Sequence, residues 1–263
     1  RRRALGLVVM GELALALVLL VVGGLSALDV RHLGRTDPGF DALGVVSFRL
    51  NLPSQRYEDG AARLSFAERY VEQLEAIPDV EAAAIASSVP LGGHWGWFFS
   101  AEDAPPRAED EANPVVLNRV VSPGYFEALG VQLQAGRAFD SFDGRDEGAP
   151  VVIVNETFVR THLSHLDDPV GARIHPGTGT PGDDAIWWTV VGVTRDVKHY
   201  GVDEEMRPGV YQPLAQNPLS AFHVALSTRG DIAPLMTRVR EVTAALDVEL
   251  PVHSVTPLET SLR

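Results

Sequence analysis

The sequence predicts an α+β protein: one N-terminal transmembrane helix, followed by an extracytoplasmic domain of two β-α-β units with an inserted strand-rich subdomain. Three observations support this fold class. A long apolar run opens the chain, a strand–helix–strand pattern occurs twice, and the residues between the two copies carry mainly short strand patterns. We expect the membrane helix within residues 1–28, the first unit at 29–93, the insertion at 94–219 and the second unit at 220–263.

The apolar opening is Ala4–Leu28, and Arg1–Arg3 precede it. As a helix it spans roughly 37 Å at ~1.5 Å per residue, which exceeds the ~30 Å of a hydrocarbon core. The arginines at its head place the N-terminus in the cytoplasm, so we expect the chain from Asp29 onward to lie outside the cytoplasmic membrane. The alternative is a cleaved signal peptide, although the apolar core of such a peptide is usually shorter.

Glu12 is the one charged residue inside this apolar run. An ionisable group within a membrane helix costs at least ~2.5 kcal/mol, so its presence suggests a functional or packing role. We expect Glu12 to contact another membrane helix. The alternatives are that its side chain reaches the basic end of the helix or that it is protonated.

Composition excludes several kinds of partner and chemistry. The formal net charge is −13, and three of the arginines precede the apolar run, so the remaining surface is strongly acidic. Such a surface argues against nucleic acid and against docking on anionic lipid. The chain has no cysteine, which excludes disulfides, thiolate metal sites and cysteine nucleophiles.

The first repeated unit begins with a half-buried strand at Val45–Leu50 and ends with an apolar strand at Val80–Val89, expected to be buried on both faces. The sequence between them predicts a helix that ends before Pro78. Its apolar positions recur at helical spacing: Leu64, Ala67, Val71 and Leu74. The two strands of such a unit should be parallel and joined in the right-handed sense.

The second unit repeats this order, with strands at Phe222–Ser227 and Pro251–Val255. The apolar positions of the helix between them are Leu235, Val239, Val242 and Leu246. Neither unit can bury its apolar strands alone. We therefore expect the two units to share one sheet, with both helices on one face of it.

The inserted residues contain mostly strand signals. We interpret His94–Phe99 as an edge strand that fills a core, with a partner-binding loop as the alternative, and Ala104–Pro114 as an exposed acidic loop. Ser122 is the predicted N-cap of a short helix with Pro123 at its first position. The other expected elements are strands at Val115–Val121, Val131–Arg137, Val151–Val154, Ile174, Trp188–Val193 and Val210–Gln212, and a helix at Glu156–His162.

No pattern predicts catalysis. Gly177–Gly182 has the glycine spacing of a phosphate-binding loop but is followed by two aspartates, which repel phosphate. His162 and His165 lack a third ligand for a metal. Four acidic residues are interpreted as a surface turn, because their spacing is not that of a calcium loop: Asp140, Asp143, Asp146 and Glu147. We expect no catalytic, cofactor-binding or metal-binding residues.

Five stretches carry a resemblance to a known family. They are Val120–Gly130, Gly136–Phe139, Val151–Thr157, Val190–Val193 with Asp196–Val197, and Tyr211–Leu214. In this order they resemble the periplasmic core domain of MacB-like, FtsX-type ABC transporter permeases, and they look most similar to orphan permeases of acidobacterial type. The resemblance extends over nearly the whole chain, including the first membrane helix and its glutamate.

This resemblance implies a porter-like part built from the two β-α-β units and an inserted strand-rich part. It also implies a non-enzymatic permease subunit in the cytoplasmic membrane, which couples ATP hydrolysis to the export or outer-side movement of a substrate. The implied partners are a cytoplasmic ABC ATPase on another chain, a second permease half or copy, and a periplasmic partner or substrate. A membrane-anchored sensing or binding domain and an anchored enzyme are the alternative classes.

Overall fold

The computed structural model describes residues 10, 12, 16–23, 37–93, 95–102, 112–145, 149–199 and 204–262. The chain forms two compact units, Arg1–Asp37 and Pro38–Arg263. Met10, Glu12 and residues 16–23 are helical, and the rest of the predicted span Ala4–Leu28 lies outside the described residues. In the described part of the chain, no helix is both long enough and apolar enough to cross a membrane. The membrane helix therefore stays a prediction.

Both copies of the repeated pattern contribute to one sheet. Its strands are β1 (Val45–Asn51), β2 (Val80–Ala86), β10 (Ala221–Thr228) and β11 (His253–Pro257), in the order β11-β1-β10-β2. Each neighbouring pair in this row is antiparallel. The expectation of a shared sheet is confirmed. The two strands of each copy are parallel, as expected, but a strand of the other copy lies between them.

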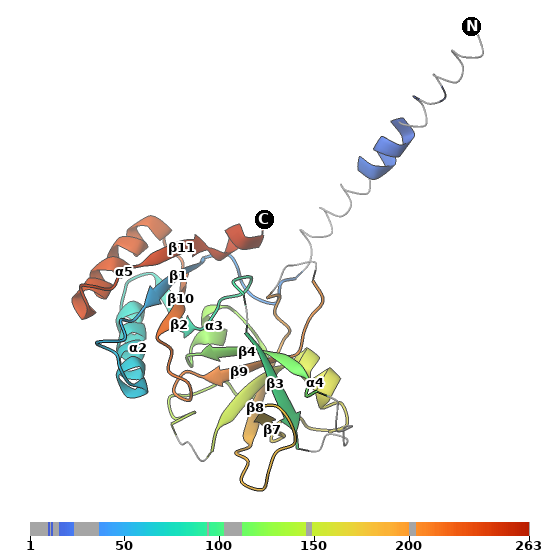
Figure 1. The fold of residues 1–263 in the computed structure, drawn as a ribbon. Helices are drawn as coiled ribbons and strands as arrows, with labels where there is room; N and C mark the ends of the chain where they lie inside the picture. The colour runs from blue at the N-terminus through green and yellow to red at the C-terminus, as the bar shows by residue number, and fades with distance from the viewer. Residues whose placement is uncertain are drawn as a thin grey trace. The chain divides into compact units, whose positions relative to one another are not determined.

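Two helices, α2 (Gly60–Glu75) and α5 (Ile232–Leu246), cover one face of this sheet (Figure 1). The Asp59 carboxylate caps α2 by accepting a hydrogen bond from the Ala62 amide at 2.7 Å. The hydroxyls of Tyr70 and Thr243 join the two helices at 2.7 Å. The placement of both helices on one face is therefore confirmed. The side chains buried beneath them include Phe48, Leu50, Phe66, Leu74, Val224, Leu226 and Val239.

Inserted residues cover the opposite face of the same sheet. The short helix α3 (Tyr125–Ala128) packs Tyr125 and Phe126 into one cluster with Ala82 and Ala84 of β2. Because the alanine side chains on this face of β2 are small, the aromatic rings of α3 can pack close to the strand. The expected burial of β2 on both faces is thus confirmed, with the helices on one side and α3 on the other.

The predicted N-cap at Ser122 is wrong. No side chain caps α3, and Gly124 occupies the capping position. The Ser122 hydroxyl instead accepts a hydrogen bond from the Ile85 amide of β2 at 2.9 Å. Serine before proline therefore does mark the turn that precedes α3. The serine hydroxyl, however, bonds to β2, which is 37 positions earlier in the sequence, and not to α3.

A narrow junction links β2 to β4 (Val115–Val121). The two strands share a single paired position, Ala86 with Val121. The Ser87 hydroxyl accepts a hydrogen bond from the Val120 amide at 3.1 Å, and the Ser122 hydroxyl described above adds another bond to β2. Two backbone hydrogen bonds, from the Ser87 amide to the Val120 carbonyl and from the Ser122 amide to the Ile85 carbonyl, both at 2.8 Å, complete this junction. The strand pairing between the two parts of the sheet is therefore short, and the packing of α3 supplements it.

Six strands of the insertion close into a ring. From β4 the order runs through β3 (Trp95–Ala101), β7 (Arg173–Pro176), β8 (Trp188–Thr194), β6 (Val151–Asn155) and β9 (Gly209–Pro213), and β9 pairs with β4 again. All six strands contribute to one hydrophobic cluster, which also contains Phe158 of α4 (Glu156–His162). β5 (Leu133–Gly136) pairs with β8 outside the ring. The 3₁₀ turn η1 (Leu258–Leu262) follows β11.

Ring closure overturns the prediction of an edge strand at His94–Phe99. β3 has β4 on one side and β7 on the other, because a closed ring leaves no strand at an edge. Phe99 does fill the core, being 1% exposed, as predicted. Most of the acidic loop expected at Ala104–Pro114 lies outside the described residues. The domain boundaries of the sequence analysis stay predictions.

Candidate functional site

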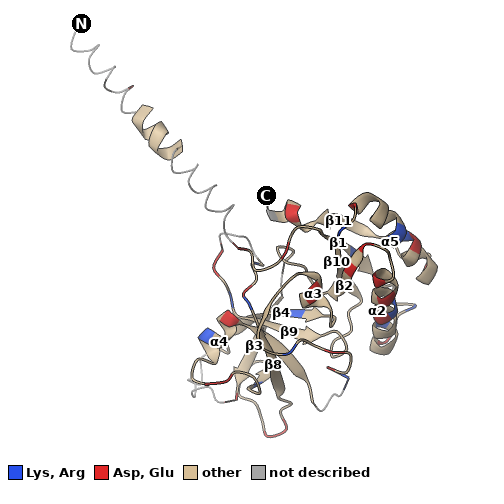
Figure 2. Ribbon diagram, turned by 180° about the vertical axis from the view of Figure 1, so that it is seen from behind, with Lys and Arg blue, Asp and Glu red and all other residues tan. Residues whose placement is uncertain are grey.

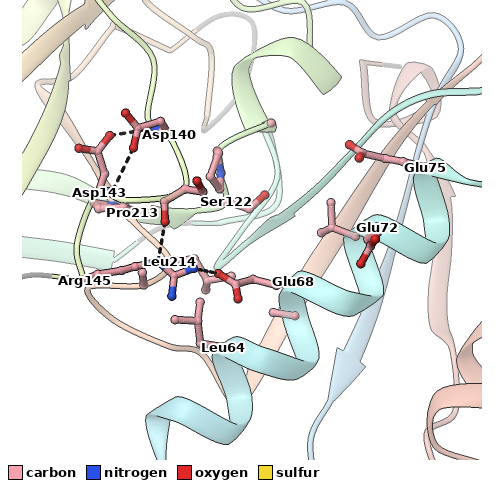
Figure 3. Close-up of a pocket in the computed structure, with 16 residues that line it drawn as sticks. Leu64, Glu68, Glu72, Glu75, Ser122, Asp140, Asp143, Arg145, Pro213 and Leu214 are labelled. Atoms are coloured by element: carbon pink, nitrogen blue, oxygen red, sulfur yellow. Dashed lines mark hydrogen bonds and ion pairs between the residues drawn. The ribbon is translucent and has the colours of Figure 1, made fainter.

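A cavity of about 480 Å³ lies between α2 and the inserted part, and we call it the α2 cleft (Figure 3). Four segments line it. They are one face of α2, the turn at residues 122–124, the turn at residues 140–145 and the segment at residues 213–215 that follows β9. Because α2 belongs to the repeated part and the other three segments belong to the insertion, the cleft lies across the narrow junction described above.

The floor of the α2 cleft is apolar. Leu64 and Val71 of α2 line the cleft and are half-buried. Leu74, on the side of α2 that faces the core, is fully buried. Pro213 and Leu214 complete the floor from the insertion side. Apolar side chains that line an open cavity stay in contact with water, so their burial by a ligand is favourable.

Acidic side chains line the α2 wall of the cleft. Glu68, Glu72 and Glu75 are exposed and spaced four and three residues apart, so they lie on one face of the helix (Figure 3). Figure 2 shows acidic residues along α2. The last turn of α2 contains no basic residue. Like charges at these spacings repel one another, and carboxylates at a helix C-terminus oppose the helix dipole. The wall therefore retains an unfavourable concentration of negative charge.

The turn at residues 140–145 forms the facing wall and is held rigidly. Arg137 donates hydrogen bonds to both carboxylate oxygens of Asp143 at 2.5 and 2.8 Å, and the Asp140 carboxylate accepts one from the Phe142 amide at 2.8 Å. Burial raises the pKa of Asp143, but the hydrogen bonds from Arg137 and the Asp140 amide outweigh it, so this pKa lies below its ordinary value.

The interpretation of this segment as an acidic surface turn is only partly correct. Asp140 is exposed, whereas Asp143 is 9% exposed and forms the ion pair with Arg137. Asp146 and Glu147 lie outside the described residues. Asp140 also lies 3.6 Å from Arg137 and accepts hydrogen bonds from the Phe142 and Asp143 amides, so both carboxylates hold the turn. What the sequence could not show is that one of them is buried.

Arg145 bridges the two walls. Its guanidinium forms an ion pair with Glu68 of α2 and donates a hydrogen bond to the Ser141 carbonyl at 2.5 Å (Figure 3). A second cavity of about 820 Å³ adjoins the cleft and shares Leu64, Arg145 and Ala215 with it. Arg145 thus lines both cavities, and its ion pair with Glu68 is a direct polar link between α2 and the insertion.

A buried cation lies in the insertion, apart from the α2 cleft. Arg119 of β4 is 1% exposed and donates one hydrogen bond, to the Gly93 carbonyl at 3.1 Å, while its Nε atom has no partner in the described part of the chain. Tyr211 lies opposite it on β9. Burial raises the pKa of Tyr211 to about 12, so this phenol stays neutral.

Several residues that the sequence analysis considered as metal or phosphate ligands contact other residues of the protein instead. The His162 ring packs on Phe99 and Phe158, with ring centroids 4.9 and 5.2 Å apart. The carbonyl oxygens of Gly177 and Gly179 accept hydrogen bonds from the Asn113 amide, both at 2.9 Å. Among the described residues, no group of three acidic, histidine or cysteine side chains is placed to hold a metal ion.

Glu12 is helical and exposed in the first compact unit. Its proposed contact with another membrane helix is not tested by the structure and stays a prediction.

Together the fold and the cleft define a class of protein: a mixed α/β domain with a cleft between two linked parts. A family model described as the MacB-like periplasmic core domain matches residues 4–245. The chain therefore belongs to the MacB-like periplasmic core domain family, and it is such a domain of an ABC transporter permease. The resemblance inferred from the five sequence stretches is confirmed.

One solved structure with a TM-score above 0.5 shares the fold, and a second similar structure is reported beside it. The periplasmic region of MacB from Actinobacillus actinomycetemcomitans is 14% identical, with a TM-score of 0.51 over 87% of this chain and 95% of that one. The extracellular domain of the noncanonic ABC-type transporter YknZ from Gram-positive bacteria is 15% identical, with a TM-score of 0.49 over 80% of this chain and 100% of that one. No curated protein sequence matches the chain.

Sequence reasoning missed the α2 cleft, although one signal for it was present. Glu68, Glu72 and Glu75 recur at helical spacing beside the apolar positions, in a helix without a basic residue in its last turn. What no signal could supply is the partner wall, because its residues are far from α2 in sequence: Arg145, for example, is 77 positions from Glu68.

Proposed function

We propose that this chain is the extracytoplasmic and first-membrane-helix segment of an ABC transporter permease subunit. In this proposal ATP is hydrolysed on another chain, and the domain transmits the resulting movement to the export or outer-side movement of a substrate. A cytoplasmic ABC ATPase and a second permease half or copy are the proposed partners. Glu12 is the proposed site of contact between the first membrane helix and another one.

The family match over residues 4–245 carries this proposal. The arrangement of the α2 cleft supports the transmission of movement. The cleft has one wall on each part of the domain, and the two parts of the sheet share only the Ala86–Val121 pair in the described residues. In this proposal, a small rotation at the junction takes place against the packing of α3 on the sheet and changes the width of the cleft.

A single-cysteine variant tests the orientation of the domain. The chain has no cysteine, so Ser141→Cys introduces the sole thiol, at an exposed position. We expect intact spheroplasts to react with a membrane-impermeant maleimide as fast as lysed ones. Ser47→Cys, at a position 4% exposed in β1, is the matched control and should stay unlabelled in both. Reaction of Ser141→Cys only after lysis contradicts the proposed orientation.

A second labelling experiment tests the coupling to ATP. Leu64→Cys places a thiol where the two cavities meet. In membrane vesicles that contain the full permease and an active ATPase partner, Mg-ATP should change the labelling rate of Leu64→Cys at least threefold, because rotation at the junction opens or closes the cleft. Val248→Cys, at a position 82% exposed, is the control and should label at a constant rate. A constant rate for both variants argues against coupling through the cleft.

A further inference from the structure

We propose that the buried guanidinium of Arg119 and the hydroxyl of Tyr125 together bind a small monovalent anion of the size of chloride. This site is built from β4 and α3 and does not include the α2 cleft. The inference goes beyond the proposed function and does not depend on it. A buried charge without a counter-ion, a second buried donor and two neutral phenols carry it.

The guanidinium of Arg119 forms no ion pair among the described residues. Its side chain is 1% exposed, and its one hydrogen bond goes to a neutral acceptor, the Gly93 carbonyl, at 3.1 Å. Its Nε atom is buried and has no acceptor in that part of the chain. A charge removed from water without a counter-charge has a large free-energy cost, which a bound anion offsets.

The carboxylate of Asp196 lies near this site but has other partners. It accepts hydrogen bonds from the amide and the hydroxyl of Thr157, at 2.9 and 2.6 Å. It also lies 3.9 Å from the guanidinium of Arg160. These contacts hold Asp196 at the start of α4, so it does not serve as the counter-ion of Arg119.

Tyr125 supplies a second donor beside Arg119. Its ring lies on Tyr211 of β9, with centroids 6.0 Å apart, and Tyr211 is the residue paired with Arg119 in the parallel register of β4 and β9. Tyr125 is 1% exposed, and its hydroxyl has no partner among the described residues. A buried N–H and a buried O–H on neighbouring side chains therefore both lack an acceptor, and one ligand atom can serve both.

Both phenols near Arg119 are neutral. Burial raises the pKa of Tyr125 strongly and that of Tyr211 to about 12, and the charge of Arg119 lowers each of them only in part. Neither ring is therefore a phenolate that neutralises the guanidinium. The Tyr211 hydroxyl has a partner of its own, Nε2 of His199 at 3.3 Å.

These surroundings select the kind of ligand. A water molecule gives the two donors an acceptor but leaves the charge of Arg119 uncompensated, whereas an anion does both. One positive charge with a neutral hydroxyl is complementary to one negative charge. Because Arg119 and Tyr125 are almost fully buried, only a small ion is compatible with the site.

The anion is expected to stabilise the connection between the two parts of the domain. The Gly93 carbonyl that accepts the bond from Arg119 also accepts one from the Ser88 hydroxyl at 2.7 Å. Both residues belong to the connection from β2 to β3, which crosses from the repeated part to the insertion. An anion that fixes the Arg119 side chain therefore also fixes this connection.

Thermal melts of the full chain in a non-ionic detergent test the proposal. Sodium chloride replaces sodium gluconate at constant ionic strength, because the gluconate anion is too large for a buried site. About 0.3 M chloride should raise the melting temperature by about 3 °C or more, since a ligand that binds only the folded state stabilises it. The nitrogen NMR signal of Arg119 Nε should shift with the same chloride dependence.

Two variants assign the effect to the site. Arg119→Met should lose the response to chloride, and in gluconate it should melt above the unchanged protein because it has no buried charge to compensate. Tyr125→Phe removes a single hydroxyl and should weaken chloride binding about threefold or more. Tyr70→Phe is the matched control: its hydroxyl is equally buried but bonds Thr243, so its response to chloride should be unchanged.

Equal melting temperatures in chloride and gluconate overturn the proposal. A chloride response that persists in both Arg119→Met and Tyr125→Phe indicates an adventitious ion only, bound elsewhere, and also overturns it. If Arg119→Met does not fold, Tyr125→Phe decides alone. None of these measurements involves the membrane orientation or ATP, so their failure leaves the proposed function standing, and failure of the labelling experiments leaves the anion site standing.

Discussion

At the scale of single residues, Arg119 is a buried cation that donates one hydrogen bond among the described residues, in a strand whose other residues are uncharged. Loss of the bond to the Gly93 carbonyl costs about 1 kcal/mol, whereas a buried unpaired charge costs several kcal/mol. We therefore predict that Arg119→Met raises the free energy of unfolding by about 1–3 kcal/mol. Urea denaturation measures this, and a lower midpoint for the variant contradicts it.

Asp247 links the end of α5 to the loop after β1. Arg56 forms an ion pair with it, and the Tyr57 hydroxyl and the Glu249 amide donate hydrogen bonds to it, both at 3.0 Å. Burial raises the pKa of Asp247, but these bonds, led by the one from Arg56, outweigh the effect and hold this pKa below its ordinary value of 3.8. The carboxylate therefore stabilises the fold fully above about pH 4, and this contribution is lost as the pH falls through the lowered value.

We predict that Asp247→Asn lowers the free energy of unfolding by about 1–2 kcal/mol at pH 7, because it weakens the charged hydrogen bond to Arg56. The effect is modest because the Arg56 side chain is half-exposed. The difference from the unchanged protein should shrink below pH 4, because protonation then removes the same interaction. Thermal melts at pH 7 and pH 3 measure both effects. Glu249→Gln is the control: its carboxylate is exposed, so its effect should be smaller. A difference that persists at pH 3 contradicts the assigned role.

At the scale of elements, helix α2 shows what periodicity can and cannot predict. The spacing of Leu64, Ala67, Val71 and Leu74 predicted the helix correctly, but the core stripe is Phe66, Ala67, Tyr70 and Leu74. The apolar face is wider than the core it covers, and the remaining positions line the cleft. A sequence shows which positions are apolar, and tertiary packing decides which of these are covered.

The wrong edge assignment of β3 has a similar cause. Its strand character was evident from its aromatic residues, but its neighbours were not. The ring closes because β4 pairs in parallel with β9, which is about 90 residues further along the chain. Side-chain alternation along one strand carries no information about so distant a pairing, so the ring had no signal in the sequence.

Leu74 tests whether the two repeated units are energetically one. Its side chain is fully buried between α2 and the shared sheet, so Leu74→Ala should cost about 2–5 kcal/mol. Because β2 and β10 are directly paired, we predict faster amide exchange in both strands, at residues 82–86 and 222–227. Val242→Ala on α5 should cost less, because this side chain is only partly buried, but it should affect the same strands.

Val154→Ala is the control for this exchange experiment, because Val154 is equally buried but lies in the cluster of the ring. It should speed exchange in β6 and β8 more than in β10. If Leu74→Ala leaves residues 222–227 as protected as before, the two units are energetically separate.

At the scale of the whole molecule, the chain forms the first repeated unit (β1, α2 and β2), then the closed ring of the insertion, and then returns to add β10 and β11 beside β1. The first and last strands of the domain are consequently neighbours: Val46 pairs with Pro257, so the start of β1 lies beside the end of β11. Because these strands are antiparallel, a pull that separates the two ends opens the pair like a zipper, one hydrogen-bonded position at a time. Such an arrangement offers little mechanical resistance. A force that pulls the two ends of the domain apart is therefore expected to detach β11 from β1 before it unfolds the rest of the sheet.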